Sequence, residues 1–250
     1  YWPGPPGETF VAALRDAADD RVVLACGRER PEPARYEVLV SGRPEEADLD
    51  ASPDLRLVVI PWAGLPPITR DRLRARPHLA LHNVHHNAPE TAEMAVGLLL
   101  AAARGLVPAD RALRQGDWRR RYDTDQGLRL VGRTAVVLGY GEIGRRVGRV
   151  LEAFDMEVHG IRSADGIEAL DARLPTADAL VVCVPSTEAT RGLLDARRLG
   201  LLPEGAIVVN VARGDVIDED ALYEALASGR LGGAGLDVWY RYPRTEEGRA

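Results

Sequence analysis

Three glycines are spaced so that a phosphate group could approach the backbone between them. Gly139, Gly141 and Gly144 stand between an apolar run at 134–138, which predicts a strand, and an amphipathic run at 142–154, which predicts a helix. In such a turn the first glycine permits the tight bend, the second leaves room for a diphosphate, and the third lets the helix pack closely on the strand. The motif predicts a dinucleotide site; a tight turn without a ligand is the alternative.

The start of the predicted helix adds hydrogen-bond donors to this turn. The backbone amides of Glu142 and Ile143 should point at the diphosphate, because the first N–H groups of a helix have no partner within the helix. Tyr140, between the first two glycines, belongs to the same turn. Glycines at this spacing are weak evidence alone, but the motif becomes specific when it joins a predicted strand to a predicted helix.

The next apolar run ends in Arg162 and Ser163, eighteen and nineteen residues after Gly144. Sites that bind NAD place an acidic residue about 20 positions further on, where it accepts hydrogen bonds from the ribose 2′-hydroxyl. A guanidinium and a hydroxyl suit a 2′-phosphate instead. The pair therefore predicts NADP(H) and argues against an S-adenosylmethionine site. A surface arginine, with Asp165 serving the ribose, is the alternative.

Arg213 is the candidate for chemistry on a substrate. It follows the apolar run 206–210, and open α/β sheets bind their ligands at the carboxyl ends of their strands. A fixed guanidinium can hold a carboxylate in a bidentate manner and can stabilise negative charge that develops as a hydride arrives. The alternative is a structural ion pair with Asp215 or Asp218.

Composition bounds the class of protein. A chain of 250 residues can hold one large or two modest domains, and a net charge of -6 argues against a nucleic-acid or anionic-membrane partner. No apolar run approaches the roughly 20 residues that span a bilayer, and no secretory signal opens the chain, so we expect a cytoplasmic protein. Cys26 and Cys183 lie in apolar runs and predict buried reduced thiols; no spacing of Cys and His predicts a metal site.

The chain contains no lysine, so all 32 basic residues are arginines. This excludes Schiff-base chemistry, a phosphate loop of the Walker type and a Tyr–Lys proton relay. Arginine cannot replace lysine as a base, because it stays protonated at any working pH.

Alternating apolar and helical segments predict an α/β fold with two Rossmann-like or flavodoxin-like domains, each built on a parallel sheet. The predicted strands are 21–26, 36–40, 56–61 and 79–84, then 134–138, 156–161, 179–184, 206–210 and 233–238. Helical spacing marks 8–19, 89–104, 142–154 and 218–228. The expected domains are a substrate domain at 1–92 and an NADP-binding domain at 93–250.

Three further segments, read with the glycine motif, carry a resemblance. They are VVCVPSTEATRGLL (181–194), IVVNVARGDVIDEDAL (207–222) and GGAGLDVWYRYP (232–243). In this order they resemble the D-2-hydroxyacid dehydrogenase family, over the stretch from Gly64 to Pro243. The resemblance implies two α/β domains with a cleft between them, a helix at 89–104 that crosses between the domains, and a homodimer formed through residues 90–130.

The same resemblance implies an enzyme that transfers hydride from NADPH to a small 2-oxo acid to give a 2-hydroxy acid. Glyoxylate, hydroxypyruvate and a phosphonate analogue are candidate substrates. Arg213 would clamp the substrate carboxylate and polarise the 2-oxo group, the amides of Ala63 and Gly64 would bind the carboxylate, and Trp62 would form a wall of the cleft. The residues implied around the cofactor are Thr91, Val184, Pro185, Thr190, Val211, Ala212 and Asp237.

The resemblance fails at the proton donor. The family places a glutamate five positions after the residue that matches Asp237, and this glutamate pairs with a histidine further on. Here that position is Tyr242, and the histidine would lie beyond Ala250. We expect a shortened chain, since it begins with Tyr1 rather than Met, so that a later segment completes the substrate domain. A dinucleotide-sensing binding protein without the chemistry is the alternative. His85 and His86, near the expected hinge, are a possible substrate contact.

Overall fold

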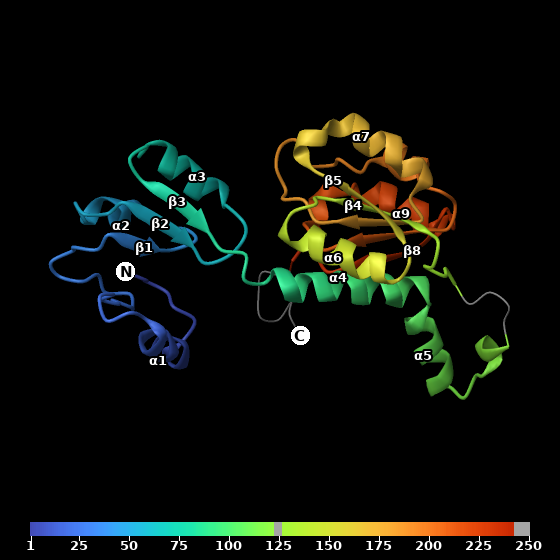
Figure 1. Cartoon of the computed structure of the whole chain (residues 1–250), viewed down its shortest axis with the longest axis horizontal. Coiled ribbons are helices and arrows are strands. Elements are labelled where there is room, and N and C mark those ends of the chain that lie inside the picture. Colours follow the sequence, from blue (N-terminus) through green and yellow to red (C-terminus); the bar gives the residue numbers. More distant parts are fainter. Residues whose placement is uncertain (123–126, 243–250) are drawn as a thin grey trace. The chain divides into compact units, whose positions relative to one another are not determined.

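The computed structural model of the chain describes residues 1–122 and 127–242. The chain divides into two compact units, Tyr1–Asn87 and Ala88–Ala250 (Figure 1). The boundary expected near residue 92 falls inside helix α4 (Ala88–Ala103), so the whole of this helix belongs to the second unit. Both units contain parallel sheets with helices, which confirms the predicted α/β class.

Unit 1 contains a three-stranded parallel sheet. Its strands run in the order β1 (Val38–Val40), β2 (Leu57–Ile60) and β3 (Ala80–Asn83). The connecting helices are α2 (Glu46–Ala51) and α3 (Pro67–Arg74), and α1 (Glu8–Ala17) precedes the sheet. The apolar core gathers the buried side chains of Tyr1, Tyr36, Leu39, Leu49, Leu55, Val58, Leu73 and Leu79. Since β1, β2 and β3 are parallel, their carboxyl ends bring three loops to one edge of the sheet.

Two predictions for unit 1 need correction. The strand predicted at 21–26 is wrong: Val22 and Val23 are 53% and 92% exposed, and only Cys26 pairs with another strand-like residue, in an isolated bridge to Trp2. An apolar run forms a strand only where a partner supplies hydrogen bonds along its length. Here Trp2 supplies them at Ala25 and Gly27 alone, which is too short a stretch for a strand. The strand predicted at 79–84 exists as β3, but it is a largely exposed edge strand rather than a buried one.

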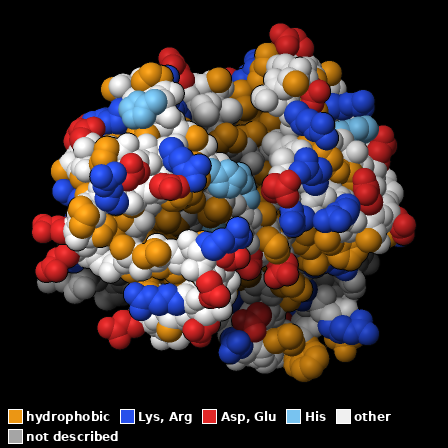
Figure 2. All heavy atoms as spheres, turned by 60° about the vertical axis from the view of Figure 1, so that its left-hand side comes forward, with side chains coloured by type: hydrophobic (Ala, Val, Ile, Leu, Met, Phe, Trp, Pro, Cys, Tyr) orange, Lys and Arg blue, Asp and Glu red, His pale blue; other side chains and the backbone are white. Residues whose placement is uncertain are grey.

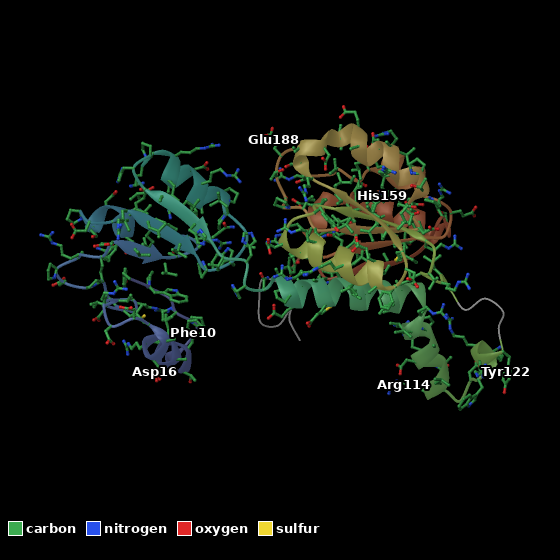
Figure 3. All side chains as sticks on the ribbon, viewed as in Figure 1. Phe10, Asp16, Arg114, Tyr122, His159 and Glu188 are labelled. Atoms are coloured by element: carbon green, nitrogen blue, oxygen red, sulfur yellow. The ribbon has the colours of Figure 1, made fainter. Side chains whose placement is uncertain are left out.

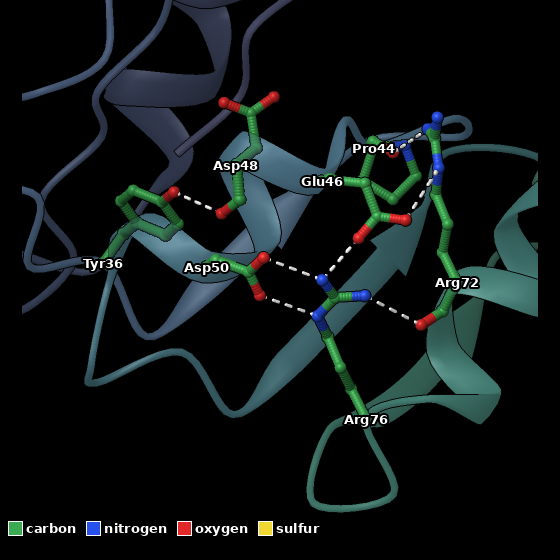
Figure 4. Close-up of polar contacts among 7 residues, drawn as sticks. All are labelled: Tyr36, Pro44, Glu46, Asp48, Asp50, Arg72 and Arg76. Carbon is green, nitrogen blue, oxygen red and sulfur yellow. Dashed lines mark hydrogen bonds and ion pairs between the residues drawn. The ribbon is translucent and has the colours of Figure 1, made fainter.

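An ion-pair network joins α2 to the end of α3 (Figure 4). The guanidinium of Arg76 contacts Asp50 at 2.8 Å and also contacts Glu46, while Arg72 approaches Glu46 at 3.5 Å. The Arg76 side chain is only 14% exposed, and its hydrogen bonds hold the pKa of Asp50 below the usual range. The network therefore holds together the two helices that follow β1 and β2.

Unit 2 contains a five-stranded parallel sheet in the order β5-β4-β6-β7-β8. The strands are β4 (Thr134–Leu138), β5 (Glu157–Ile161), β6 (Ala179–Val182), β7 (Ala206–Asn210) and β8 (Leu231–Leu236). All five strands predicted for this half are present. The three central ones, β4, β6 and β7, are buried on both faces, and such strands appear in a sequence as continuous apolar runs. Counted along the chain from β4, the order is that of the flavodoxin-like doubly wound fold.

Helices cover both faces of this sheet (Figure 1). On one face α4 and α6 (Glu142–Ala153) bury Ala95, Leu99, Val147 and Leu151 against Val137 and Val181. On the other face α7 (Gly166–Arg173), α8 (Ala196–Leu201) and α9 (Glu219–Ala227) bury Leu170, Leu199 and Leu222 against Val136, Leu180 and Val208. Successive strand residues therefore serve opposite layers, which fixes the register of each strand.

The helix α5 (Leu106–Arg114) and the 3-10 helix Arg119–Arg121 extend from the end of α4, away from the sheet of unit 2 (Figure 1). Within the described residues no single helix is both long and apolar enough to cross a bilayer; α4 and α5 reach that length and composition only together, across a bend of 63°. On the face drawn in Figure 2, acidic and basic side chains are interspersed.

Candidate functional site

The glycine turn of unit 2 brings two segments of backbone into contact. Gly139 has a φ of 96°, a conformation that other residues rarely adopt. A Cβ at this position would lie 2.7 Å from the carbonyl carbon of Cys183 and 2.8 Å from the nitrogen of Val184. The turn after β4 therefore touches the chain after β6, and only glycine allows this approach.

The other two glycines have different surroundings. A Cβ on Gly144 would collide with the carbonyl oxygen of Gly139 and approach Val137, so this glycine lets α6 pack on β4. A Cβ on Gly141 would meet nothing within 4 Å. The space in front of the turn is thus open at the one position where a diphosphate is expected to approach.

The first turn of α6 presents amides without a side-chain cap. Its N-cap residue is Gly141, whereas α8 and α9 begin with Asp195 and Asp218, whose carboxylates accept hydrogen bonds from backbone amides at 2.8 Å. Helix α6 is therefore the one of these three whose first N–H groups have no side-chain cap and can donate to an external anion.

The carbonyl oxygen of Ile161 ties the glycine turn to the end of β5. It accepts hydrogen bonds from the amides of Gly139 at 2.8 Å and Tyr140 at 3.0 Å. The ring of Tyr140 lies against Gly160 on β5 and Gly148 on α6, where side chains would collide with it. These contacts set where Arg162 and Ser163 begin relative to the turn.

Arg162 is exposed, and its guanidinium meets no carboxylate within the part of the chain that the structure describes. Its backbone amide donates to Asp165 at 2.7 Å, so one carboxylate oxygen of Asp165 is already engaged by the backbone. Ser163 opens the short 3-10 helix Ser163–Asp165 and is also exposed. A cation and a hydroxyl thus stand at the end of β5, free to meet a phosphate.

The loop after β6 is closed by its own side chains. Thr190 donates its hydroxyl proton to the carbonyl oxygen of Pro185 at 2.6 Å and accepts the Thr187 amide at 2.8 Å. Ser186 donates to Asp215 at 2.8 Å, and Arg191 pairs with the same carboxylate at 3.3 Å. The loop that carries Val184, Pro185 and Thr190 is therefore fastened to the loop after β7.

Arg213 is held by a buried asparagine that sequence reasoning did not single out. Asn210, at the end of β7, accepts the Ala212 amide at 3.0 Å and donates to the carbonyl oxygen of Arg213 at 2.9 Å. Asn210, Val211 and Ala212 are buried, while the side chain of Arg213 is exposed. A polar residue ending an otherwise apolar strand was the signal that could have identified Asn210.

The two carboxylates that could have paired with Arg213 are used elsewhere. Asp215 binds Ser186 and Arg191, and Asp218 caps α9. The guanidinium of Arg213 contacts only the carbonyl oxygen of Ala212, at 2.6 Å, among the described polar contacts. This leaves a positively charged group at the carboxyl edge of the sheet that can receive a carboxylate.

Asp237 joins the same edge from β8. Its amide donates to the carbonyl oxygen of Asn210 at 3.0 Å, and its side chain is exposed. Further on, the hydroxyl of Tyr242 accepts the amide of Trp239 at 3.1 Å, and Tyr242 is itself exposed. Pro243, the last residue of the resemblance, lies outside the described residues.

The loop expected to hold the substrate lies in unit 1, after β2. The ring of Trp62 packs on Gly42 in the loop after β1, where a Cβ would collide with it. Asn83, at the end of β3, donates to the carbonyl oxygen of Ala63 at 2.6 Å. The amides of Ala63 and Gly64 are thus presented by a loop fixed from both neighbouring strands. Neither Gly42 nor Asn83 was singled out from the sequence.

The structure gives fewer contacts for the threonine and histidine candidates of the sequence analysis. Thr91 lies in the first turns of α4, within unit 2, and His85 and His86 are exposed at the end of unit 1. His159 lies on the edge strand β5 and pairs with Glu157 at 3.0 Å (Figure 3). Among the described residues no three His, Cys, Asp or Glu side chains are grouped so that they could hold a metal ion.

The two cysteines are free thiols, and neither is fully buried. Cys183 lies directly after β6, where burial raises the pKa of its thiol to about 12. At neutral pH this thiol is protonated and unreactive, which fits a packing role next to Gly139 rather than a nucleophilic one.

The family model described as "D-isomer specific 2-hydroxyacid dehydrogenase, NAD binding domain" matches residues 96–249. The chain belongs to this family. The match covers most of unit 2 and therefore assigns the glycine turn, the end of β5 and the loops after β6 and β7 to an NAD-binding domain.

Curated relatives agree with this assignment. D-3-phosphoglycerate dehydrogenase of Mycobacterium tuberculosis is 36% identical over 251 residues, which cover 94% of this chain and 47% of that protein. Hydroxypyruvate reductase of Thermotoga maritima is 33% identical over 206 residues, or 80% of this chain and 67% of that protein. The chain thus spans about half the length of the phosphoglycerate dehydrogenases that it matches.

Solved structures share the fold. A D-isomer specific 2-hydroxyacid dehydrogenase from Xanthobacter autotrophicus Py2, in complex with NADPH and MES, aligns with a TM-score of 0.79 and 28% identity, over 98% of this chain and 82% of that one. D-lactate dehydrogenase from Aquifex aeolicus, complexed with NAD and lactic acid, aligns with a TM-score of 0.73 and 25% identity. The alignment covers 96% of this chain and 76% of that one.

Substitutions at the second and third glycines should separate binding from folding. Gly141→Ala adds a methyl group in open space, so we expect a normal melting temperature and a loss of dinucleotide affinity of about tenfold or more. Gly144→Val should instead destabilise the protein by about 2–3 kcal/mol, because the added atoms collide with backbone. Calorimetric titration and thermal unfolding of both variants measure this. Unchanged affinity in Gly141→Ala would remove the glycine turn from the site.

Proposed function

We propose that the chain is part of an NADP(H)-dependent oxidoreductase that reduces a small 2-oxo acid to the 2-hydroxy acid. The observation that carries the proposal is the Arg213 guanidinium, which meets no carboxylate within the described residues and is placed by Asn210 at the sheet edge that bears the glycine turn. Such a group binds a carboxylate and stabilises negative charge on a neighbouring oxygen. The relatives named hydroxypyruvate reductase and glycerate dehydrogenase support a small acid as substrate.

The preference for NADP(H) rests on Arg162 and Ser163. A 2′-phosphate carries close to two negative charges and needs donors, which a guanidinium and a hydroxyl provide. The relative from Xanthobacter autotrophicus is described with NADPH, whereas the one from Aquifex aeolicus is described with NAD, so the family includes both. Arg162, without a carboxylate partner among the described residues, favours the phosphorylated form here.

The proposal assigns each cofactor-binding residue a role. The amides of Glu142 and Ile143 bind the diphosphate, and the loop with Val184, Pro185 and Thr190 flanks the adenosine and ribose. Val211 and Ala212 lie beside the nicotinamide, and Asp237 accepts a hydrogen bond from its carboxamide. Thr91 contributes to the phosphates. When bound, the reduced nicotinamide supplies the hydride.

In this proposal each unit contributes groups suited to the substrate. In unit 2, Arg213 holds the carboxylate and withdraws electron density from the 2-oxo group. In unit 1, the amides of Ala63 and Gly64 are carboxylate donors, with Trp62 beside them. Glyoxylate and hydroxypyruvate are the first candidates, and a phosphonate analogue is a third. The two free thiols suit a reducing compartment, so we assign the protein to the cytoplasm.

One observation favours a second candidate function. Tyr242 occupies the position where the resemblance expects a glutamate, and its hydroxyl is engaged by the Trp239 amide. A protein that binds the dinucleotide without turning over substrate would tolerate this change. The decisive experiment follows absorbance of the reduced nicotinamide with a panel of small 2-oxo acids, using NADPH and NADH in parallel. Turnover supports the reductase, and saturable binding without turnover supports the sensor.

Arg213→Ala should lower kcat/KM by at least about 10²–10³-fold, because the variant loses the charge that stabilises the developing alkoxide. Affinity for NADPH should stay within about twofold of the wild type. Steady-state kinetics and fluorescence titration give the two values. Arg133→Ala, at the opposite end of β4, is the matched control and should change neither. Retained turnover in Arg213→Ala would exclude the proposed role.

Arg162→Asp should reverse the cofactor preference. We expect NADPH affinity to fall about 10–100-fold, since a charge-assisted hydrogen bond is replaced by repulsion, while NADH affinity holds or improves. Arg149→Asp makes the same change of charge on an exposed part of α6 and should leave both affinities nearly unchanged. An unaltered ratio of the two dissociation constants in Arg162→Asp would exclude the 2′-phosphate assignment.

We also propose a homodimer that buries the surface of α5 and the segment after it. Five apolar side chains there are more than half exposed, namely Leu106, Val107, Leu113, Trp118 and Tyr122. Figure 3 shows Arg114 and Tyr122 on this part of unit 2, away from the sheet. An exposed apolar surface of this kind is typical of an interface.

Trp118→Glu should convert the dimer to a monomer, because a charge would be buried at the interface. Light scattering coupled to size-exclusion chromatography measures the mass. Tyr223→Glu changes an equally exposed aromatic residue on α9 and should leave the dimer intact. A monomeric wild type would exclude the dimer.

A further inference from the structure

An acidic side chain stands at the phosphate end of α6. Glu142 is the first residue of the helix and the one acid in its first turn. Its carboxylate binds Arg146 at 2.8 Å and also pairs with Arg145, and Arg146 donates to the Glu142 carbonyl oxygen at 2.8 Å. The hydrogen bond from Arg146 and the charge of Arg145 lower the pKa of Glu142, so the group is ionised at neutral pH.

This anion belongs to the first turn of α6, the turn whose amides the diphosphate would meet, and its two guanidinium partners lie one turn further along the helix. The positive end of the α6 dipole favours one negative charge in the absence of a ligand, and Glu142 supplies it. The same carboxylate also neutralises two guanidinium groups that would otherwise attract a phosphate. A dinucleotide approaching Gly141 therefore meets a site whose positive charge is already partly satisfied from within the chain.

We propose that Glu142 is an internal counter-anion that limits dinucleotide affinity and speeds dinucleotide release. The inference rests on the proposed function, because it assumes that a dinucleotide binds at this turn. The proposed role of the Glu142 carboxylate is to repel the diphosphate, whereas Arg162 and Arg213 are proposed to attract a ligand. Because the diphosphate is common to NADPH and NADH, Glu142 should weaken both to the same degree, unlike Arg162, which should distinguish them.

The test removes the charge without changing the size of the side chain. Glu142→Gln should tighten the binding of both NADPH and NADH by about five- to tenfold at low ionic strength, with dissociation slowed by a similar factor. In about 0.5 M salt the gain should shrink to less than about twofold, because the charges are partly exposed and screened. Fluorescence titration and stopped-flow displacement give the affinity and the rate.

Two variants make the result specific. Glu152→Gln removes the same charge from the exposed far end of α6 and should leave both affinities unchanged. Glu142→Asp keeps the negative charge, so its affinities for NADPH and NADH should stay within about twofold of the wild type. A melting temperature near that of the wild type shows that each variant is folded.

Equal affinity in Glu142→Gln and wild type, weaker binding in Glu142→Gln, or an equal gain in Glu152→Gln would each overturn the inference. A gain confined to NADPH would also overturn it, since it would place the charge beside the 2′-phosphate. If the wild type bound neither dinucleotide, the proposed function would fail, and that outcome is distinct from the others because it needs no variant.

Discussion

The site of unit 2 depends on the approach of two backbone segments where the strand order reverses. β4 lies between β5 and β6, so the chain leaves the carboxyl ends of β4 and β6 toward opposite faces of the sheet, and open α/β sheets bind their ligands at such a reversal. At this point Gly139 touches the backbone of Cys183 and Val184. A side chain there would force the two loops apart, and the amides of α6 would no longer face the same space as the loop after β6.

Two acceptors extend this arrangement along the sheet edge. The carbonyl oxygen of Ile161 holds the glycine turn beside the end of β5, and buried Asn210 holds the loop with Arg213 and the start of the segment after β8. Ile161 and Asn210 each end a strand, and they bind the loops through a backbone carbonyl or a short side chain, which have little conformational freedom. Arg162 and Arg213, the charged groups proposed to meet ligands, are exposed but begin from fixed backbone.

The sequence was sufficient for most of unit 2 and for less of unit 1. Strands such as 134–138 and 206–210 were found because burial on both faces leaves an apolar run that few other structures produce. The run 21–26 has the same composition but no partner strand, and composition cannot reveal a missing partner. Five of the described α-helices were not predicted, namely α2, α3, α5, α7 and α8. All but α5 have eight residues or fewer, and α5 buries no side chain that would mark a periodic face.

The candidate site shows the same division between pattern and geometry. The glycines, Arg162 and Arg213 were found because each stands at a fixed place relative to a predicted strand or helix. Asn210, Asn83 and Gly42 act through partners 3, 20 and 20 residues away in the chain, and only the folded sheet of unit 1 brings the two more distant pairs together. Polar residues that place a backbone loop have no spacing rule of their own.

In the proposed function, charge rather than shape determines how tightly the phosphate end of the site binds. In a chain without lysine the basic side chains are guanidinium groups, which favour planar, bidentate partners, and about half of those in the described residues pair with carboxylates. Arg162 and Arg213 have no such partner there, whereas Arg145 and Arg146 are held by Glu142. In the proposed site, two guanidinium groups without a carboxylate partner would attract a dinucleotide, and two held by an acid at the helix start would allow its release.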